Sequence, residues 1–158
     1  MNNFVAALAA ACLVAAVPAA AQDTNAAAVA ELNALQKAAK ADKRALVNEK
    51  LALTPAESTK FWPVYDICQR EHAGIMRKRA LALETLVARD RPLTDAYART
   101  ITNDLVTLDE AGVRAERKCT NATLKVLPAR KAARYLQLEN KLRVLQEYEI
   151  AVAFPLAQ

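Results

Sequence analysis

Two Leu-Thr pairs, each at the start of a long helix-favouring segment, constrain the fold of this chain more than any other feature. Thr54 can cap a helix with its hydroxyl, Pro55 suits the first helical position, and Glu57 can return a hydrogen bond to the cap. Thr94 can cap a second helix, where Asp95 places negative charge at the positive end of the helix dipole. Because the chain has only two glycines, little else interrupts these segments. The pattern predicts a helical hairpin.

Hydrophobic periodicity predicts four helical segments, and no strand alternation competes with them. They run from about residue 26 to 50, from 54 to about 89, from 94 to about 126, and from 128 to about 154. The first has a weak apolar stripe, which is typical of a segment that is partly disordered or docked only in part. Pro63 lies inside the second and removes one backbone hydrogen bond, which predicts a kink or a short separate first turn.

The second and third segments carry apolar stripes that would face each other in a hairpin. The stripe on the second segment is Phe61, Tyr65, Cys68, His72, Ile75, Ala82 and Leu86, with Arg79 as a polar interruption. The third repeats in alternating steps of three and four residues, as in a heptad seam. Its members are Ala98, Ile101, Leu105, Leu108, Gly112, Ala115, Cys119, Ala122 and Val126. The sequence therefore predicts an all-α fold, an elongated antiparallel helical hairpin with additional N- and C-terminal helices, which dimerises to cover its broad face.

An apolar run of about 14 residues opens the chain and leads to three consecutive alanines. The run is shorter than the roughly 20 residues that a membrane span needs, and the Ala-x-Ala end is typical of a secretory signal peptide. We interpret residues 1–21 as this signal peptide. Residues 22–50 are then expected to form an N-terminal helical segment that is in part disordered, and residues 51–158 the main helical domain.

The chain carries a formal net charge of +5, all of it outside the predicted signal peptide. A basic protein could bind nucleic acid, but export removes that partner, and the few aromatic residues offer few stacking platforms. We therefore expect no nucleic acid partner. A basic exported surface is better suited to acidic protein segments, anionic lipid headgroups or lipopolysaccharide.

Two cysteines, Cys68 and Cys119, remain in the predicted mature chain, and both lie on the inward stripes. Their midpoint falls at residues 93–94, the predicted turn of the hairpin. Residues equally far from a tight antiparallel turn lie opposite each other, and an exported protein meets an oxidising compartment. A disulfide that closes the hairpin is the leading interpretation, with intermolecular pairing or two buried thiols as alternatives.

A zinc site is a more specific alternative for the same two cysteines. Cys68 and His72 are four residues apart on one helical face, and Cys119 could approach from the facing helix. Glu71 or Glu116 could supply a fourth ligand.

Catalysis has less support, because the chain has one histidine, no glycine-rich loop and no convergent polar cluster. We expect no enzyme activity and no required cofactor.

The stretch LTPAESTKFWPVYD, with its helix start and aromatic-proline signature, is similar to one branch of the Spy/CpxP-type periplasmic proteins, the LTxxQ-motif family. Glu57 stands where the first motif has Gln, and Tyr97 stands there in the second. The resemblance implies a periplasmic location and an antiparallel helical hairpin that pairs into a curved, cradle-like homodimer. It also implies an ATP-independent chaperone or an envelope-stress sensor, and some members bind metal.

Basic side chains crowd the predicted hairpin arms among apolar positions, which suits the capture of unfolded or partly folded envelope proteins. The candidate client-binding residues are Arg70, Arg77, Lys78, Arg79, Arg114, Arg117 and Lys118. The expected function is that of a periplasmic holding chaperone or envelope-stress accessory protein. The alternatives are a metal-responsive sensor and a dedicated adaptor of a membrane sensor protein.

Overall fold

The computed structural model describes residues 19–87 and 93–156, which form four helices and no strand within those ranges. The helices are α1 (Ala19–Leu51), α2 (Pro55–Val87), α3 (Asp95–Val126) and α4 (Ala129–Ala153). The all-α prediction is confirmed. Most of the predicted signal peptide, residues 1–21, and the predicted break at residues 89–92 lie outside the described residues. No described helix is both long and apolar enough to cross a membrane.

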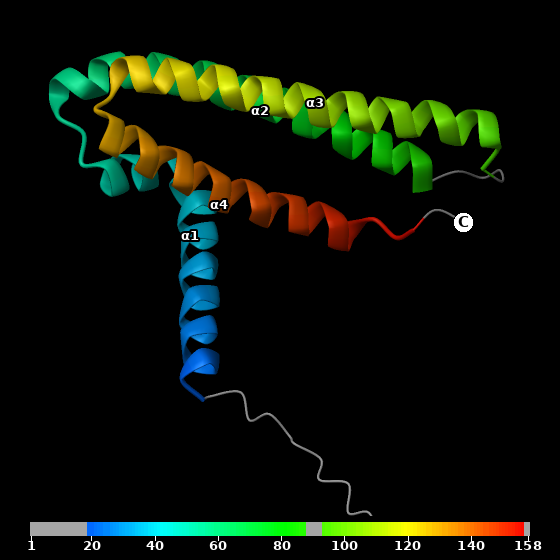
Figure 1. Cartoon of the computed structure of the whole chain (residues 1–158), viewed down its shortest axis with the longest axis horizontal. Helices are drawn as coiled ribbons and strands as arrows, with labels where there is room; N and C mark the ends of the chain where they lie inside the picture. Colours follow the sequence, from blue (N-terminus) through cyan, green and yellow to red (C-terminus); the bar gives the residue numbers. More distant parts are fainter. Residues whose placement is uncertain (1–18, 88–92, 157–158) are drawn as a thin grey trace, which may run out of the picture.

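The helices are arranged as two pairs (Figure 1). Helices α2 and α3 lie side by side as a long antiparallel hairpin, and α4 runs back along the hairpin but diverges from it towards its C-terminal end. Helix α1 packs on α4, and its N-terminal part projects away from the hairpin. The elongated hairpin with helices added at both ends follows the predicted architecture.

Helix α1 is interrupted at Asp42, which the sequence analysis did not predict. Asp42 has extended backbone angles, with φ −158° and ψ 95°, and its Oδ1 accepts a hydrogen bond from the backbone N–H of Ala45 at 2.9 Å. This is the geometry of a helix N-cap, so Asp42 ends one helix and starts another. The resulting change of direction lets the two parts of α1 meet different neighbours.

Helix α2 continues through Pro63 as one helix from Pro55 to Val87. The separate first turn predicted at this proline is therefore absent. Pro63 itself is exposed, while its neighbours Phe61 and Tyr65 are buried. The burial of these two aromatic side chains outweighs the loss of one backbone hydrogen bond at the proline.

The hydrophobic core lies at the end of the molecule where α1, α2 and the start of α4 meet. Phe61 packs edge-on against Tyr135, with ring centroids 5.1 Å apart, and Tyr65 lies 6.2 Å from the same ring. The guanidinium of Arg44 lies over the ring of Trp62 at 4.2 Å, which closes the cluster from the side of α1. The other buried members are Leu35, Leu46, Val47, Leu51, Leu127, Ala132 and Leu138.

The predicted boundary between residues 22–50 and 51–158 does not separate two packing units. Leu46 and Val47, which precede the boundary, share one core with Phe61 and Tyr135. Helix α1 is also tied to α4 by ion pairs such as Lys141 to Glu31, at 2.7 Å. The N-terminal segment is therefore part of the main domain from at least residue 31 onward.

Cys68 and Cys119 face each other across the α2–α3 seam and form a disulfide, with their Cα atoms 5.8 Å apart. This is the pairing that their spacing about the hairpin turn predicts. The bond joins residues 51 positions apart, so it restricts the unfolded chain strongly. It also holds the two arms together beyond the core cluster.

Replacing both cysteines, as Cys68→Ala/Cys119→Ala, should lower the free energy of unfolding by about 2–4 kcal/mol, because the unfolded chain gains entropy. Urea unfolding followed by circular dichroism measures this change. Wild-type protein unfolded in a reducing agent is the matched control and should show a similar loss. A loss below about 1 kcal/mol would contradict the structural role of the bond.

Thr123 on α3 is fully buried, and its hydroxyl has no hydrogen-bond partner among the described residues. Thr123→Val should raise the free energy of unfolding by about 1 kcal/mol, because valine has the same shape without the unpaired hydroxyl. Thr123→Ser keeps the hydroxyl and loses a methyl group, so it should destabilise the protein. Urea midpoints of the three proteins test the order; a valine variant less stable than wild type would show that the hydroxyl is satisfied.

Candidate functional site

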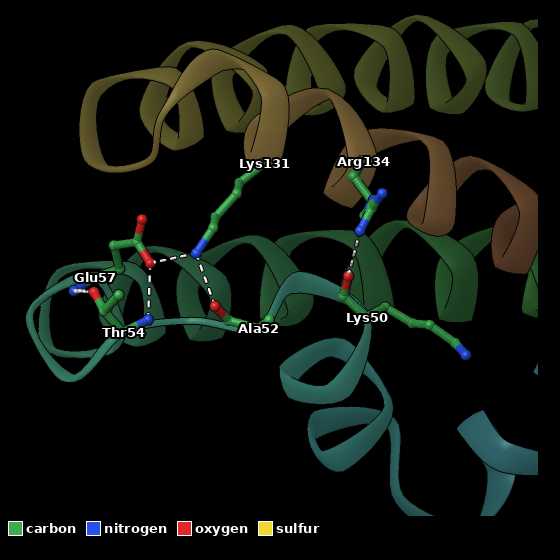
Figure 2. A network of polar contacts seen from close by, with 6 residues as sticks. All are labelled: Lys50, Ala52, Thr54, Glu57, Lys131 and Arg134. Atoms are coloured by element: carbon green, nitrogen blue, oxygen red, sulfur yellow. Dashed lines mark hydrogen bonds and ion pairs between the residues drawn. The ribbon is translucent and has the colours of Figure 1, made fainter.

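The first Leu-Thr motif forms the predicted reciprocal cap at the start of α2 (Figure 2). The backbone N–H of Thr54 donates to Glu57 Oε2 at 2.8 Å, and the N–H of Glu57 donates to Thr54 Oγ1 at 3.3 Å. The second motif caps α3, since Thr94 Oγ1 accepts from the N–H of Tyr97 at 3.4 Å. Thr54, Glu57 and Thr94 therefore act as helix caps.

A second role of Glu57 was not visible in the sequence. Lys131, at the start of α4, donates to Glu57 Oε2 at 2.7 Å and to the backbone carbonyl of Ala52 at 2.8 Å. Arg134 reaches the carbonyl of Lys50 at 3.4 Å. The hydrogen bond from Lys131, followed by the one from the Thr54 backbone, lowers the pKa of Glu57. The network shown in Figure 2 fastens the α1–α2 turn to α4.

Three of the predicted client-binding residues lie on one exposed face of α2. Arg70 and Arg77 are seven residues apart and so share a face, and Lys78 lies beside Arg77. None of the three has an ion-pair partner within residues 19–87 and 93–156. Ile67 and Leu81 lie on the same face with 49% and 62% of their surface exposed. This face therefore combines uncompensated positive charge with apolar surface.

Three more of the predicted residues gather on α3. Arg114, Arg117 and Lys118 border a shallow hollow of about 500 Å³, together with Lys125. Arg114 pairs with Glu110 at 3.3 Å and Lys118 pairs with Glu71 of α2 at 2.9 Å. Arg117 has no such partner in the described part of the chain. The cluster has an excess of positive charge. The exposed apolar side chains Val106 and Leu124 share the face of Arg117.

Arg79 differs from the other predicted client-binding residues. Its guanidinium pairs with Asp109 of α3, and both side chains border a cleft on the α4 side of the hairpin. The inward stripe of α2 contains Arg79, so the helical period places it away from Arg77 and Lys78. We therefore remove Arg79 from the candidate client-binding surface.

Helix α4 diverges from the α2–α3 hairpin towards its C-terminal end (Figure 1). A cleft with a volume of about 320 Å³ is lined by residues of the hairpin and of α4. Its inner wall includes Cys68 and Cys119, so the disulfide lines it. At one end, Lys43 of α1 donates to Glu139 of α4 at 2.8 Å and to Gln69 of α2 at 2.7 Å. The Gln69 amide in turn donates to Glu139 at 3.1 Å. Three helices thus meet in one polar network.

His72 lies in the cleft wall next to this network. Burial, followed by the nearby charge of Lys43, lowers the pKa of His72 below its usual value of 6.5. Arg143 of α4 acts in the same direction, while Glu139 opposes it. At pH 7 His72 is therefore neutral, and it contributes a hydrogen-bonding ring without charge to the cleft.

The zinc alternative would need both thiolates as ligands, and Cys68 and Cys119 are bonded to each other. Within residues 19–87 and 93–156, no group of three His, Cys, Asp or Glu side chains is arranged to hold a metal ion. A site made of Cys68, His72 and Cys119 thus remains a prediction that concerns the reduced protein only.

Comparisons with known protein families, with curated proteins and with solved structures found no match for this chain. The geometry above therefore carries the functional argument. It defines an all-α protein with two candidate sites, namely the exposed cationic and apolar surface of the hairpin and the cleft beside α4.

The sequence analysis missed the cleft and the residues that organise it, Lys43, Gln69 and Glu139. A signal was present for Glu139, which follows Tyr135 by four residues and precedes Leu142 by three on the apolar face of α4. A charged residue in such a position predicts a partner on a neighbouring helix. The identity of that partner depends on how the helices pack.

The lowered pKa of His72 predicts a pH dependence of stability. His72 binds a proton less readily in the folded protein than in the unfolded chain. Its contribution to the free energy of unfolding is therefore complete above pH 6.5 and decreases as the pH falls below that value. Urea unfolding at pH 7.5 and 5.5 should show a smaller loss of stability in His72→Gln than in wild type. Equal losses in the two proteins would exclude His72 as the source.

Proposed function

We propose that this protein is a periplasmic, ATP-independent holding chaperone that binds unfolded or partly folded envelope proteins on the outer surface of its helical hairpin. The observation that carries the proposal is the mixture of exposed cations and exposed apolar side chains on α2 and α3. The cations are Arg70, Arg77, Lys78, Arg114, Arg117 and Lys118, and the apolar side chains are Ile67, Leu81, Val106 and Leu124.

The chemistry of this surface suits weak and rapid capture. The cations without an ion-pair partner among the described residues, Arg70, Arg77, Lys78 and Arg117, attract acidic chain segments over long range, so they raise the rate of encounter at low salt. Apolar side chains then hold the segment by burying its hydrophobic residues, at about 25 cal/mol per Å². Because the apolar residues are separated by charged ones, each contact is small and a client can leave without an energy source.

The location and the partners rest on sequence arguments. The predicted signal peptide supports export, and the resemblance to Spy/CpxP-type proteins supports both the periplasm and the homodimer. The small core supports dimerisation further, because the hairpin beyond the disulfide buries few of its own side chains. No nucleic acid, nucleotide or metal is needed for holding.

A dedicated adaptor of a membrane sensor is the second candidate, and one observation favours it. Val144, Tyr148 and Val152 recur at four-residue spacing on α4 and are 53%, 68% and 69% exposed. Such a contiguous apolar stripe suits one specific partner better than many clients. A chaperone should act on unrelated clients, whereas an adaptor should act on none of them.

Residues 22–158 should suppress the aggregation of two unrelated model clients, measured by light scattering without ATP. Arg77→Gln/Lys78→Gln should slow client capture about threefold at low salt, because two uncompensated cations are lost from the outer face of α2. The difference from wild type should shrink at high salt, where charges are screened.

The matched control is Lys37→Gln/Arg130→Gln, which removes two exposed cations from α1 and α4. Its net charge equals that of the Arg77→Gln/Lys78→Gln variant. It should capture clients at the wild-type rate. Equal slowing in both double variants would mean that net charge, rather than the hairpin surface, sets the rate. Absence of suppression by the folded wild-type protein would overturn the chaperone proposal and favour the adaptor.

A further inference from the structure

The cleft beside α4 has the size and the wall of a ligand site. Its volume of about 320 Å³ lies within the range of small-molecule pockets, roughly 300–1,000 Å³. Ile75 and Met76 of α2, Leu108 of α3 and Leu142 of α4 supply apolar surface around the disulfide. The apolar part of the wall therefore comes from three helices, and two of them are joined covalently at this point.

The α3 side of the cleft includes Gly112, which has no side chain. A Cβ atom built at Gly112 meets no atom within 4 Å, so the space next to it is open. The neighbouring wall residue Ala115 is also small. Glycine is not required here by the backbone, since Gly112 lies in the middle of a regular helix without a positive φ. The small residues at these positions keep open a space that larger side chains would fill.

The charges that border the cleft are paired with one another. Lys43 is bound to Glu139, and Arg79 is bound to Asp109. Arg143 is bound to Glu147 at 3.1 Å. A charged ligand would have to break one of these pairs, which costs free energy in a partly buried site. The uncharged polar side chains of the wall are Gln69, His72 and Gln146. Gln69 is already bound to Lys43 and Glu139, whereas His72 and Gln146 share a hydrogen bond with each other and have no bond to a charged side chain among the described residues.

We propose that the cleft between the hairpin and α4 binds a small uncharged molecule with an aromatic or branched aliphatic body and a hydrogen-bonding edge. The body would lie against Ile75, Met76 and Leu108, next to Gly112. The edge would face the imidazole of His72 and the amide of Gln146. This site lies on the α4 side of the hairpin, so it is separate from the proposed client-binding face and does not depend on it.

Two fluorescent probes with the same aromatic body test the proposal. N-phenyl-1-naphthylamine is uncharged, and 8-anilinonaphthalene-1-sulfonate carries one negative charge. The uncharged probe should bind the wild-type protein at one site, with a measurable Kd. Gly112→Leu, which fills the open space, should weaken that binding about tenfold. The sulfonate should bind more weakly at this site, and Gly112→Leu should change its fluorescence little.

Gly74→Leu is the matched control, because a Cβ at Gly74 also meets no atom within 4 Å and Gly74 does not line the cleft. Both substitutions replace a mid-helix glycine, so both should favour helix equally. The control should bind the uncharged probe with the wild-type Kd. Circular dichroism and thermal unfolding establish that each variant is folded.

A second pair of variants tests the site if Gly112→Leu does not fold. Leu108→Gln changes the apolar wall and should weaken binding about tenfold, whereas Leu81→Gln on the outer face should not. The proposal is overturned if the uncharged probe fails to bind wild type, or if the cleft variants bind as tightly as their controls. It is also overturned if the two probes bind the cleft equally well, since the ligand class would then be wrong.

Discussion

The contact between Phe61 and Tyr135 joins the two helix pairs, and the rest of the architecture depends on it. Phe61 belongs to α2, which packs against α3, and Tyr135 belongs to α4, which packs against α1. Without this aromatic contact and the buried side chains around it, the hairpin and the α1–α4 pair would share little apolar surface. The capping network of Glu57 and Lys131 lies at the same end, so it reinforces the same junction with hydrogen bonds.

Because the core is confined to that end, the other parts of the molecule are free to carry binding surfaces. The hairpin arms extend beyond the core and are held together by the Cys68–Cys119 disulfide and the seam around it. Helix α4 diverges from the hairpin towards its C-terminal end, and residues of both line the cleft. On the opposite side of the hairpin, none of the described helices covers the exposed cations. The position of α4 relative to the hairpin therefore determines both candidate sites: the cleft on one side and the exposed cationic surface on the other.

Local features of the structure could be predicted well from the sequence. The helix starts at Thr54 and Thr94 were predicted from capping hydrogen bonds that span three residues. The pairing of Cys68 with Cys119 was predicted from symmetry about the hairpin turn. Asp42 was missed although aspartate is a common N-cap, because the surrounding alanines favour an uninterrupted helix.

The sequence by itself determined where the hairpin helices begin, which stripes form their seam and which cysteines meet. These properties depend on hydrogen bonds within one helical turn and on a period that the chain carries along its length. Only the tertiary structure decided that Arg79 pairs with Asp109, that Lys43 meets Glu139, and that Gly112 borders a cleft. Those outcomes depend on the rotation and divergence of whole helices. Such rigid-body relations are set by the sum of many weak contacts between segments far apart in the chain, and no short motif encodes them.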